Sequence, residues 1–527
     1  MLLSPLSPRE DHQAKLARAT LHQERGELAT AARLCREVLA TNPLHAEALH
    51  MAGVLAAMQG DAAEAATLLG RAVQAQPTDA RAHMNLGNAL LDLRRPADAL
   101  AAFDRAVALD RSKASVFYNR GVALADLRRH AEALESYTRA VALDPDHVEA
   151  HFGIGNMQTV LRRPAAALAA YDRALARAPR RADLWVQRAN RLQELGRFAE
   201  AIVGYARAHT LAPHDPAAPF AAALCHLMLG EYERGWRLYE WRLRRDDMRP
   251  TLRLFAEPLW HCHEPAADRT VLLHAEQGFG DTIQFCRYAD VVADLGWNVV
   301  LEVQPELVTV MRSLAGAHTV VARGEALPPF DAQMPLLGLP LAFGTTVATI
   351  PAHTPYLRAE PARAERWTQI LGPRTRSRIG VAWSVGGTEP GDPRAIPLGQ
   401  FAALCTGGAD YVSLHKDIGD DDRATLAGLQ IRTVDDEIAD FADTAALIAA
   451  LDLVITVDTA VAHLAGALGR PVWLLVSRPN ASFMWRWLLR RDDSPWYPTA
   501  RLFRQGDDGE WGAAIAAARA ALDAWLR

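Results

Sequence analysis

A period of 34 residues runs through the first half of the chain and constrains its fold more than any other feature. Glycine recurs at this interval between Gly53 and Gly155, and alanine recurs at it between Ala31 and Ala201. Most of these alanines are followed, four residues later, by a large side chain, which is Leu69 in one unit and Phe or Tyr in later ones. A fixed period of this length is typical of an α-solenoid, in which each helix pair stacks against the next.

The frame of the repeat predicts where each helix pair begins. Small residues at fixed points let two antiparallel helices approach closely, the aromatic ring fills the space between pairs, and a proline column ends the second helix. These columns resemble the tetratricopeptide repeat, and as packing positions they carry no chemistry of their own. We expect a solenoid over residues 12–249, with about seven units and less regular ends. The units are expected to begin near His12, Ala46, Ala80, Ala114, Val148, Ala182 and Pro216.

Asparagines on the first helix of several units are candidates for binding a partner. Polar side chains on the concave surface of a solenoid can bind an extended peptide, and an amide both donates to and accepts from peptide backbone. The alternative is that they are solvated amides on a helix surface. The groove as a whole predicts a protein or peptide partner more strongly than any single asparagine does. Asn85 and Asn119 share one repeat position, and Asn88, Asn156 and Asn190 share another.

Composition narrows the class of protein. A length of 527 residues corresponds to about three ordinary domains. The net charge of −5 provides no long-range attraction for nucleic acid. The five cysteines are scattered and lack any Cys-x-x-Cys spacing, so we expect no disulfide framework, and a reducing cytoplasm fits best. No export signal and no apolar run of the roughly 18 residues needed for a membrane span is recognised.

The pattern changes after Trp241, where the period stops. Short runs rich in Val, Ile and Leu on both faces then alternate with helical segments, as in parallel sheets covered by helices. Proline-marked breaks near residues 250 and 365 divide this half, so we expect two Rossmann-like lobes, 250–365 and 366–527, facing one cleft. The expected strands are 270–274, 298–303, 378–384, 410–415, 452–458 and 471–476.

Two glycines and an acid follow the first of these strands, in the segment Gly278-Phe-Gly280-Asp281. Such a turn leaves backbone N–H groups near a helix start, where an anion or a developing oxyanion is favoured. Asp281 lies at the mouth of the turn, and its alternative role is that of a helix N-cap. Because the third glycine of the dinucleotide fingerprint is missing, a nicotinamide cofactor is not expected.

A second anion site is predicted where a later strand ends at Asp458. Small residues open a helix there, and free amides at Thr459, Ala460 and Val461, together with the positive helix end, can hold a pyrophosphate. Asp458 would fix the turn or a sugar hydroxyl. His463 lies further along the same helix, and a lone histidine of this kind is more often structural than a ligand.

Together the two motifs resemble those of glycosyltransferase family nine, the ADP-heptose:lipopolysaccharide heptosyltransferases, which have GT-B architecture. The resemblance spans most of residues 270–527, and repeats followed by such a domain are similar in architecture to the O-linked N-acetylglucosamine transferases. The resemblance to family nine is also carried by Trp383-Ser384, by Arg394-Ala-Ile-Pro-Leu398, by residues 440–446 and by the aromatic tail over residues 485–505.

The resemblance implies a role for each matching position. Asp281 matches the carboxylate that removes the proton from the acceptor hydroxyl, and Arg394 matches a basic residue on the donor diphosphate. The implied reaction is an inverting transfer from a nucleotide sugar, with no metal and no cofactor, in which lobe 250–365 takes the acceptor and lobe 366–527 the donor. The implied donor site comprises Gly278, Gly280, Trp383, Ser384, Arg394, Asp458, Thr459, Ala460, Val461 and His463.

The solenoid favours a protein Ser or Thr as acceptor, and two alternatives stay open. The repeat-bearing relatives are expected to read Trp-Ser-Gly-Asn and Arg-Ser-Ile-Pro-Leu. This chain differs from the first motif at Val385 and Gly386 and from the second at Ala395. These departures favour a non-catalytic interaction scaffold with a degenerate transferase domain. The second alternative is a transferase that acts on a cell-envelope glycan.

Three further features have simpler interpretations. The run Asp420-Asp421-Asp422 is expected to be a solvated charge run on a loop rather than a metal site. His261-Cys262-His263 has zinc-ligand types but no second half-site. The aromatic cluster over residues 485–497 either stacks on a base or sugar or packs the C-terminal segment against the sheet.

Overall fold

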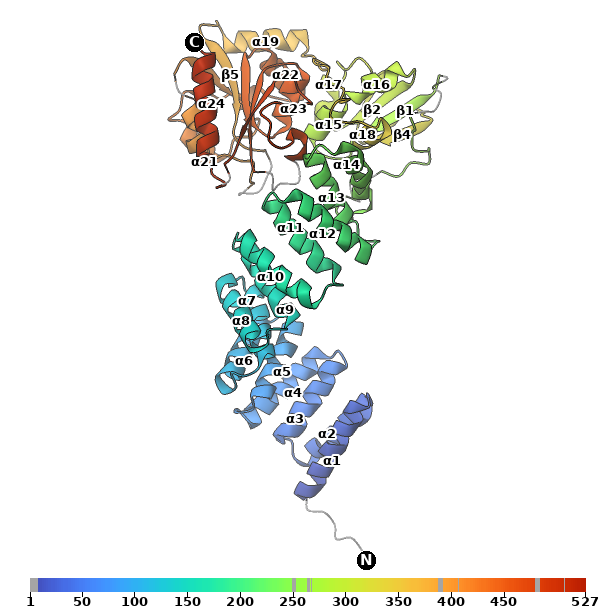
Figure 1. Cartoon of the computed structure of the whole chain (residues 1–527), viewed down its shortest axis with the longest axis vertical. Coiled ribbons are helices and arrows are strands. Elements are labelled where there is room, and N and C mark those ends of the chain that lie inside the picture. The colour runs from blue at the N-terminus through green and yellow to red at the C-terminus, as the bar shows by residue number, and fades with distance from the viewer. Residues whose placement is uncertain are drawn as a thin grey trace, which may run out of the picture. The chain divides into compact units, whose positions relative to one another are not determined.

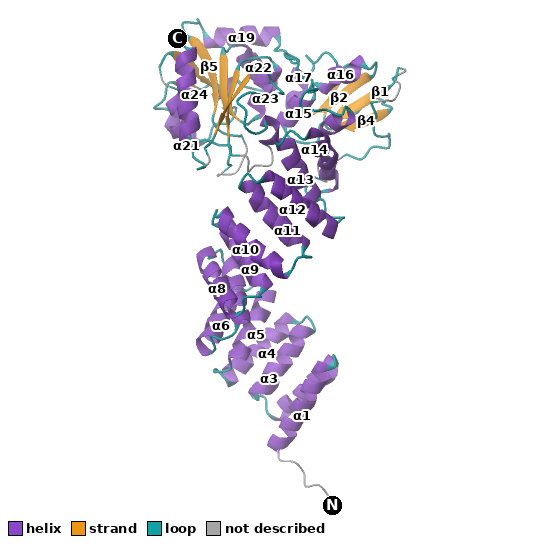
Figure 2. Ribbon diagram, viewed as in Figure 1, coloured by secondary structure: helices purple, strands orange, loops and turns teal. Residues whose placement is uncertain are grey.

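The computed structural model describes residues 8–248, 253–262, 266, 268–386, 392–405, 407–478, 484–506 and 508–527. Its contacts divide the chain into two compact units, one up to Leu195 and one from Gly196 onward. Figure 2 shows that the strands all belong to the second unit. Among the described residues, no helix is both long enough and apolar enough to cross a membrane.

The first unit is a stack of helix pairs, coloured from blue to green in Figure 1. From the second pair on, the first helix of each pair begins at the residue that the period predicts, which confirms the repeat in this part of the chain. The helices are α1 (Pro8–Glu24), α2 (Leu28–Thr41), α3 (Ala46–Met58), α4 (Ala62–Ala75), α5 (Ala80–Asp92), α6 (Pro96–Leu109), α7 (Ala114–Asp126), α8 (His130–Leu143), α9 (Val148–Val160), α10 (Pro164–Arg177) and α11 (Ala182–Glu194).

Close approach between helices explains the repeated glycines. A Cβ atom placed on Gly121 would lie 2.6 Å from Cε1 of Tyr137, and one placed on Gly87 would lie 2.6 Å from Cε1 of Phe103. Protein interiors are close-packed and do not tolerate such distances without a shift of the neighbouring ring. The glycine column and the aromatic column therefore depend on each other.

A second periodic feature lies in the turn between the two helices of each pair. Gly60 and Gly196 have φ angles of 83° and 73°, and at the same repeat position Arg94, Arg128 and Arg162 have φ angles of 57°, 58° and 57°. The left-handed conformation costs a non-glycine residue roughly 1 kcal/mol or more. Packing of the helices on either side therefore holds these arginine turns against their own conformational preference.

The glycine column gives a first prediction. We expect Gly121→Ala to lower the free energy of unfolding of the first unit by about 1–3 kcal/mol, because overpacking outweighs the roughly 1 kcal/mol gain in helix propensity. Gly70→Ala in α4 is the matched control, since a Cβ there meets no described atom within 4 Å and should be neutral or stabilising. Urea denaturation followed by far-ultraviolet circular dichroism measures both. Equal effects of the two substitutions would contradict the packing role.

The second unit begins with helices that continue the repeat: α12 (Phe198–Leu211), α13 (Ala217–Met228), α14 (Tyr232–Tyr239) and η1 (Glu240–Arg244). Trp236 on α14 is buried and donates from Nε1 to the carbonyl of Thr345 at 3.1 Å. Trp496 donates from Nε1 to the hydroxyl of Tyr232 at 3.1 Å. These last repeat helices therefore share a core with the sheets, and the boundary expected near residue 250 lies outside the described residues.

The first sheet has four parallel strands in the order β3-β2-β1-β4. Leu272 on β1 pairs with Val300 on β2, and both are buried, as expected for strands covered on both faces. Its elements are β1 (Thr270–His274), α15 (Phe279–Phe285), α16 (Tyr288–Asp294), β2 (Asn298–Val303), η3 (Pro305–Leu307), α17 (Val308–Met311), β3 (Thr319–Ala322), β4 (Ala332–Pro335), η4 (Leu336–Gly338) and α18 (Leu339–Ala342).

The second sheet has six parallel strands in the order β10-β9-β8-β5-β6-β7. Its elements are α19 (Pro361–Leu371), β5 (Ser377–Ala382), α20 (Leu398–Phe401), η5 (Ala402–Leu404), β6 (Ala409–Ser413), α21 (Asp420–Leu426), β7 (Ile431–Arg432), η6 (Asp435–Glu437), α22 (Phe441–Ala449), β8 (Leu453–Val457), α23 (Ala460–Ala467), β9 (Val472–Val476), η7 (Met484–Trp487), β10 (Ala500–Arg504) and α24 (Gly512–Trp525).

The six expected strands are all present, and they are the interior strands of the two sheets. The four strands that the sequence did not predict, β3, β4, β7 and β10, lie at the sheet edges. Edge strands are often short or carry charged side chains: β7 has two residues, and β10 carries Arg501 and Arg504 beside three buried residues. The division expected near residue 365 falls inside α19, between the two sheets in the chain.

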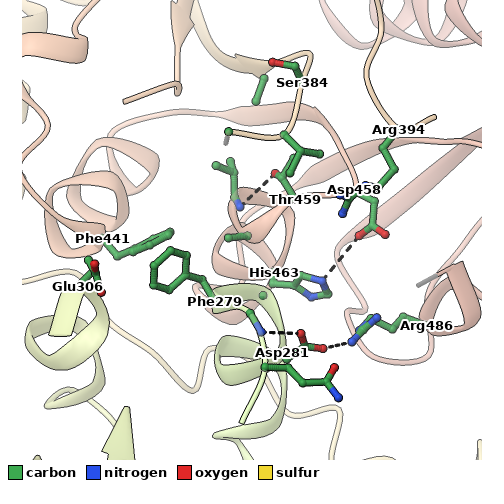
Figure 3. A pocket seen from close by; sticks show the side chains of 18 of the residues that line it. Phe279, Asp281, Glu306, Ser384, Arg394, Phe441, Asp458, Thr459, His463 and Arg486 are labelled. Carbon is green, nitrogen blue, oxygen red and sulfur yellow. Dashed lines mark hydrogen bonds and ion pairs between the residues drawn. The ribbon is translucent and has the colours of Figure 1, made fainter. Parts of the chain in front are cut away.

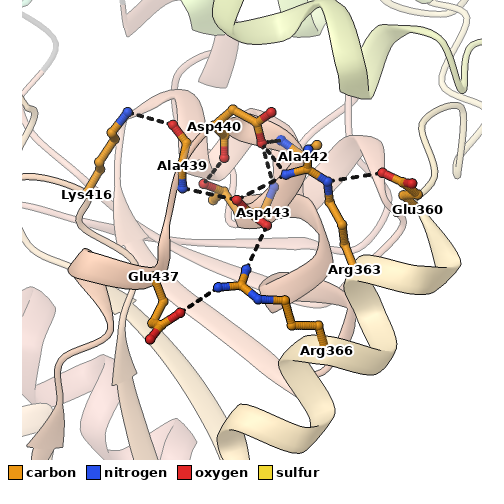
Figure 4. A network of polar contacts seen from close by, with 10 residues as sticks. Glu360, Arg363, Arg366, Lys416, Glu437, Ala439, Asp440, Ala442 and Asp443 are labelled. Carbon is orange, nitrogen blue, oxygen red and sulfur yellow. Dashed lines mark hydrogen bonds and ion pairs between the residues drawn. The ribbon is translucent and has the colours of Figure 1, made fainter.

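A polar network ties α19 to the start of α22 (Figure 4). Arg363 donates to Asp440 at 2.9 Å and pairs with Asp443 at 3.0 Å, and Arg366 pairs with Asp443 at 3.4 Å. Asp440 is also the N-cap of α22, because its Oδ1 accepts from the backbone N–H of Ala442 and Asp443. The acids of the 440–446 motif therefore anchor a helix.

Candidate functional site

A cavity of about 700 Å³ lies where several parallel strands end. The segments that follow β1, β2, β5, β6 and β8 all contribute lining residues, and we call the space the strand-end cavity. Ligands of open parallel sheets bind at this end, since the loops there are free to carry function. Of the predicted site residues, its lining includes Gly278, Gly280, Asp281, Ser384, Arg394, Asp458, Thr459, Ala460, Val461 and His463.

Asp281 lies in the first turn of α15, where its carboxylate bonds to two groups. Its Oδ2 accepts from the backbone N–H of Gly278 at 3.1 Å. Gly278 is the N-cap of α15 and Asp281 is its third residue, so Asp281 caps the helix start as expected but is not itself the N-cap. Its Oδ1 forms an ion pair with Arg486, which comes from η7. The carboxylate remains 17% exposed and faces the cavity beside Arg486 (Figure 3). Capping and contact with the cavity are therefore compatible in this residue.

Gly280 is explained by a close approach of α15 to α23. A Cβ atom at this position would lie 2.9 Å from Cδ2 of His463 and 3.8 Å from Cα of Ala460. Any larger residue would push apart the helices that carry Asp281 and the second motif. Gly278 has an ordinary φ of −72°, so its turn does not require glycine.

His463 is buried between the two motifs. Its Nδ1 lies 2.9 Å from the hydroxyl of Tyr497, its Nε2 lies 3.8 Å from Asp458 Oδ1, and its ring stacks on Trp487. Burial, reinforced by the charge of Arg486, holds the pKa of this imidazole well below its usual value. A neutral, packed imidazole agrees with the expectation that His463 is a structural residue rather than a ligand.

Asp458 follows β8, and Thr459 is the N-cap of α23. Thr459 Oγ1 accepts from the N–H of Val461 at 3.2 Å, so the expectation that all three amides are free is wrong for Val461. The cap hydroxyl takes this amide because an N-cap side chain reaches the second helical residue. Burial raises the pKa of Asp458 to about 6, against the opposing effect of the Arg486 charge.

This pKa gives a second prediction. Because the folded-state pKa of Asp458 is raised, its protonated form stabilises the fold below about pH 4, and that stability is lost as the pH rises through about 6. We expect the free energy of unfolding of Asp458→Asn, relative to wild type, to increase between pH 4.5 and about 7. Urea denaturation at several pH values measures the difference. A difference that stays constant or falls over this range would contradict the burial of an ionisable Asp458.

Arg394 lines the cavity but carries a carboxylate partner of its own. Its Nε donates to Asp392 Oδ1 at 3.0 Å and its NH2 group to Oδ2 at 2.7 Å. Trp383 is buried, and its Nε1 donates to Asp422 at 2.7 Å, whereas the neighbouring Ser384 lines the cavity. Trp383 is therefore not among the residues that line the cavity.

The sequence did not identify several lining residues. Phe279 and Phe441 have ring centroids 5.0 Å apart, and Figure 3 draws them with Glu306 on the side of the cavity away from Arg394. Arg486 was expected only as part of an aromatic cluster. Its pairing with Asp281 joins residues 205 positions apart in the chain, a distance at which sequence spacing carries no signal.

The aromatic cluster over residues 485–497 is mainly a packing element. Trp487, Trp496 and Tyr497 are at most 1% exposed, and Trp485 packs edge-on against Trp236 with ring centroids 5.3 Å apart. These rings therefore pack as the second alternative expects, but against Trp236 of α14 and His463 of α23 rather than against strands of the sheet. Trp485 and Arg486 also line the cavity from this segment.

Two of the residues weighed as metal ligands, Asp422 and Cys262, make structural contacts. The acidic run at 420–422 forms the first turn of α21, so the expectation of a loop was wrong, and Asp422 accepts the indole N–H of Trp383. Acids favour a helix N-terminus, which accounts for the run. Cys262 donates to the carbonyl of Ala342, and His263 lies outside the described residues. Within the described part of the chain, no group of three or more His, Cys, Asp or Glu residues is arranged to hold a metal ion.

The predicted asparagines are half-buried side chains on the first helices of their pairs. Several are bonded within the repeats: Asn85 Nδ2 lies 2.8 Å from His50 Nε2, and Asn119 donates to Asn88 at 2.7 Å. Asn156 accepts from the hydroxyl of Tyr171 at 2.8 Å, and Asn190 lies on α11. Peptide binding by these amides stays a prediction.

Two family models match the chain. The tetratricopeptide repeat matches residues 16–80, 59–114, 84–146 and 118–182. Glycosyltransferase family 9 (heptosyltransferase) matches residues 439–476, which contain α22, β8, α23 and β9. The first unit is thus built from tetratricopeptide repeats, and the C-terminal region contains a glycosyltransferase-like segment. Asp458 lies within that match, and Asp281 and Arg394 lie outside it.

A curated relative is Protein FlbA of Caulobacter vibrioides, 27% identical over 322 residues, which cover 55% of this chain and 52% of FlbA. The chain thus matches about half of that relative's length. Solved structures with similarity include MamA, which is 24% identical with a TM-score of 0.30 over 31% of this chain and 94% of MamA. The tetratricopeptide protein YrrB is 25% identical with a TM-score of 0.30 over 31% of this chain and 85% of YrrB. Pseudomonas aeruginosa pilF is 18% identical with a TM-score of 0.37 over 41% of this chain and 98% of pilF. TM-scores this low carry no conclusion about fold or function.

Proposed function

We propose that the second unit is an inverting glycosyltransferase of GT-B type, which moves a sugar from a nucleotide sugar to a Ser or Thr hydroxyl of a protein. The observation that carries this proposal is that Asp281 and the Asp458–Thr459 turn, from two different sheets, line one strand-end cavity. A base and a donor site must lie within reach of the same reacting atoms. The match of residues 439–476 to a heptosyltransferase family supports the assignment of the second sheet to the donor.

The donor diphosphate is proposed to lie at the N-terminus of α23. The N–H groups of Thr459 and Ala460 and the positive end of the helix would receive phosphate oxygens, with the Arg394 guanidinium beside them. Arg394 is held by Asp392, which fixes the direction of its guanidinium. Donors of this kind stabilise a departing diphosphate without a metal ion.

Asp281 is proposed as the general base. The acceptor oxygen attacks the anomeric carbon as the bond from that carbon to the diphosphate oxygen breaks, and the acceptor proton passes to the carboxylate of Asp281. A carboxylate has roughly four acceptor sites, of which Gly278 and Arg486 occupy two. Arg486 would orient the carboxylate toward the acceptor.

The acceptor class rests on the tetratricopeptide repeats, since a stack of such repeats is suited to binding an extended polypeptide. The departures at Val385, Gly386 and Ala395 favour the alternative of a scaffold whose transferase domain is degenerate. Donor binding separates the two functions, because a scaffold needs no nucleotide sugar. The cytoplasmic location likewise stays a prediction.

Calorimetry with a panel of UDP-, GDP-, ADP- and CMP-linked sugars tests the proposal. We expect one member of the panel to bind, and Arg394→Ala to weaken that binding about ten- to a hundredfold through loss of a charge-assisted hydrogen bond. Arg519→Ala, which removes a surface partner of Asp523 on α24, is the control and should bind like wild type. Absence of binding by every member, or equal binding by Arg394→Ala, would favour the scaffold.

A further inference from the structure

The strand-end cavity has a wall that comes from the last repeat helices rather than from either sheet. Phe220 and Leu224 of α13, Tyr239 of α14, and Met248 beyond η1 line the same cavity as Asp281. All of these residues belong to the second compact unit. We call Phe220, Leu224 and Met248 the repeat wall. Donor binding and proton removal, as proposed above, make no use of it.

Tyr239 places the repeat wall next to the turn that carries Asp281. Its hydroxyl accepts from Nε2 of Gln277 at 3.4 Å, and the negative charge of Asp281 contributes, after burial, to raising its pKa to about 12. Three residues further on, Arg242 donates to both carboxylate oxygens of Glu276, at 3.2 and 2.9 Å. Both groups of this ion pair are buried. The end of the repeat and the Asp281 turn are thus fixed to each other on two sides.

The repeat wall is apolar but has polar groups at fixed positions beside it. Phe220 is half-buried, with its ring centroid 5.5 Å from that of Tyr239 and the guanidinium of Arg245 lying 4.6 Å from it. Arg245 in turn donates to Asp247 through two hydrogen bonds, of 2.9 and 2.7 Å. Arg245 and Asp247 also line the cavity. An apolar surface is therefore bordered by N–H donors and carboxylate oxygens.

We propose that the repeat wall binds a bulky apolar side chain of the acceptor polypeptide, close in sequence to the Ser or Thr whose hydroxyl is presented to Asp281. The inference rests on the proposed function and deepens it by naming a specificity determinant. An extended chain advances about 3.3 Å per residue, and the wall lines the same cavity as Asp281, so we expect the apolar side chain to lie within about two residues of the hydroxyl.

The composition of the surface favours a polypeptide over a polyprenyl lipid. A lipid chain leaves no polar group to satisfy, so Arg245, Asp247 and Gln277 would gain nothing beside it. Peptide N–H and C=O groups, in contrast, can pair with these side chains while the apolar side chain covers Phe220. The wall also continues directly from the repeat segment of the chain, whose proposed ligand is a polypeptide.

An array of short synthetic peptides, each with a central Ser or Thr and varied flanking residues, tests the inference with the full-length protein. We expect the bound peptides to be enriched in Phe, Leu, Ile or Met within two residues of the centre. Phe220→Ala and Met248→Glu should weaken binding of these peptides about ten- to a hundredfold, and Phe220→Leu should restore most of it. Val203→Ala on α12 is the control, because Val203 is 67% exposed and lies outside the cavity lining.

Three outcomes would overturn the inference: an array without apolar enrichment, enrichment that is unchanged in Phe220→Ala and Met248→Glu, or no peptide binding while vesicles carrying a polyprenyl phosphate bind in a Phe220-dependent way. Nucleotide-sugar calorimetry on the same variants keeps the two proposals apart. Peptide selection without donor binding would leave the wall as a peptide site and remove the transferase, whereas donor binding without apolar selection would remove the wall alone.

Discussion

Asp281→Asn is expected to reduce sugar transfer about a hundredfold to ten-thousandfold, the usual contribution of a positioned general base. The substitution keeps an oxygen that can accept the N–H of Gly278, so the helix start should persist, while the group that takes the acceptor proton is removed. Donor affinity should change little, because the donor phosphates are proposed to lie at α23. Transfer is measured as nucleoside diphosphate release dependent on an acceptor, alongside calorimetric donor binding.

Asp294→Asn on α16 is the matched control for this experiment. Asp294 is an exposed aspartate in the same sheet region and does not line the strand-end cavity. Its replacement should leave transfer unchanged. If Asp281→Asn transfers sugar at the wild-type rate, Asp281 is not the base. If both donor binding and transfer fail together, with the fold intact, the residue would belong to the donor site instead.

Arg242→Ala is expected to lower the free energy of unfolding of the second unit by about 3–5 kcal/mol, the largest stability effect anticipated here. Arg242 is fully buried, and its removal leaves Glu276, which is 1% exposed, as a buried charge without its partner. Tryptophan fluorescence during urea denaturation reports on this unit, since every tryptophan except Trp185 lies after Gly196.

The control is Arg237→Ala, on the helix just before. Arg237 and Glu233 form an exposed pair about three-quarters open to solvent, so this substitution should change stability by no more than about 0.5 kcal/mol. Equal effects of Arg237→Ala and Arg242→Ala would show that burial of the Arg242–Glu276 pair does not matter.

Because Trp236 and Arg242 are part of the core, a fragment meant to contain the second unit should start at Gly196 rather than near residue 250.

The sequence pattern predicted the helices and strands wherever the spacing of apolar residues agrees with the residues that are buried in the structure. The repeat predicted helix starts such as Ala80 and Ala114 because every unit meets the same neighbours, and interior strands such as β1 and β8 were predicted because both of their faces are apolar. The edge strands were missed because β3 and β7 are short and have one buried residue each, while polar residues interrupt the apolar pattern of β4 and β10. The left-handed turns at Arg94, Arg128 and Arg162 were missed because packing of the helices, and not the residue type, imposes them.

The site was predictable where its residues are close in sequence. Asp281 and Asp458 were identified from short motifs at strand ends, and both line one cavity. The ion pair of Arg486 with Asp281 and the bond from Trp383 to Asp422 depend on how distant segments meet, so spacing carried no information about them. The repeat wall was missed for the same reason, since Phe220 and Asp281 come together only through packing of α14 against α15 and of α13 against η7.

A crystal structure of the full chain with the tightest-binding nucleotide sugar of the panel would test the central claim most directly. The account predicts diphosphate oxygens about 3 Å from the N–H groups of Thr459 and Ala460 and from the Arg394 guanidinium, with the anomeric carbon turned toward Asp281. A nucleotide sugar bound elsewhere on the protein, or an empty strand-end cavity at saturating nucleotide sugar, would contradict it.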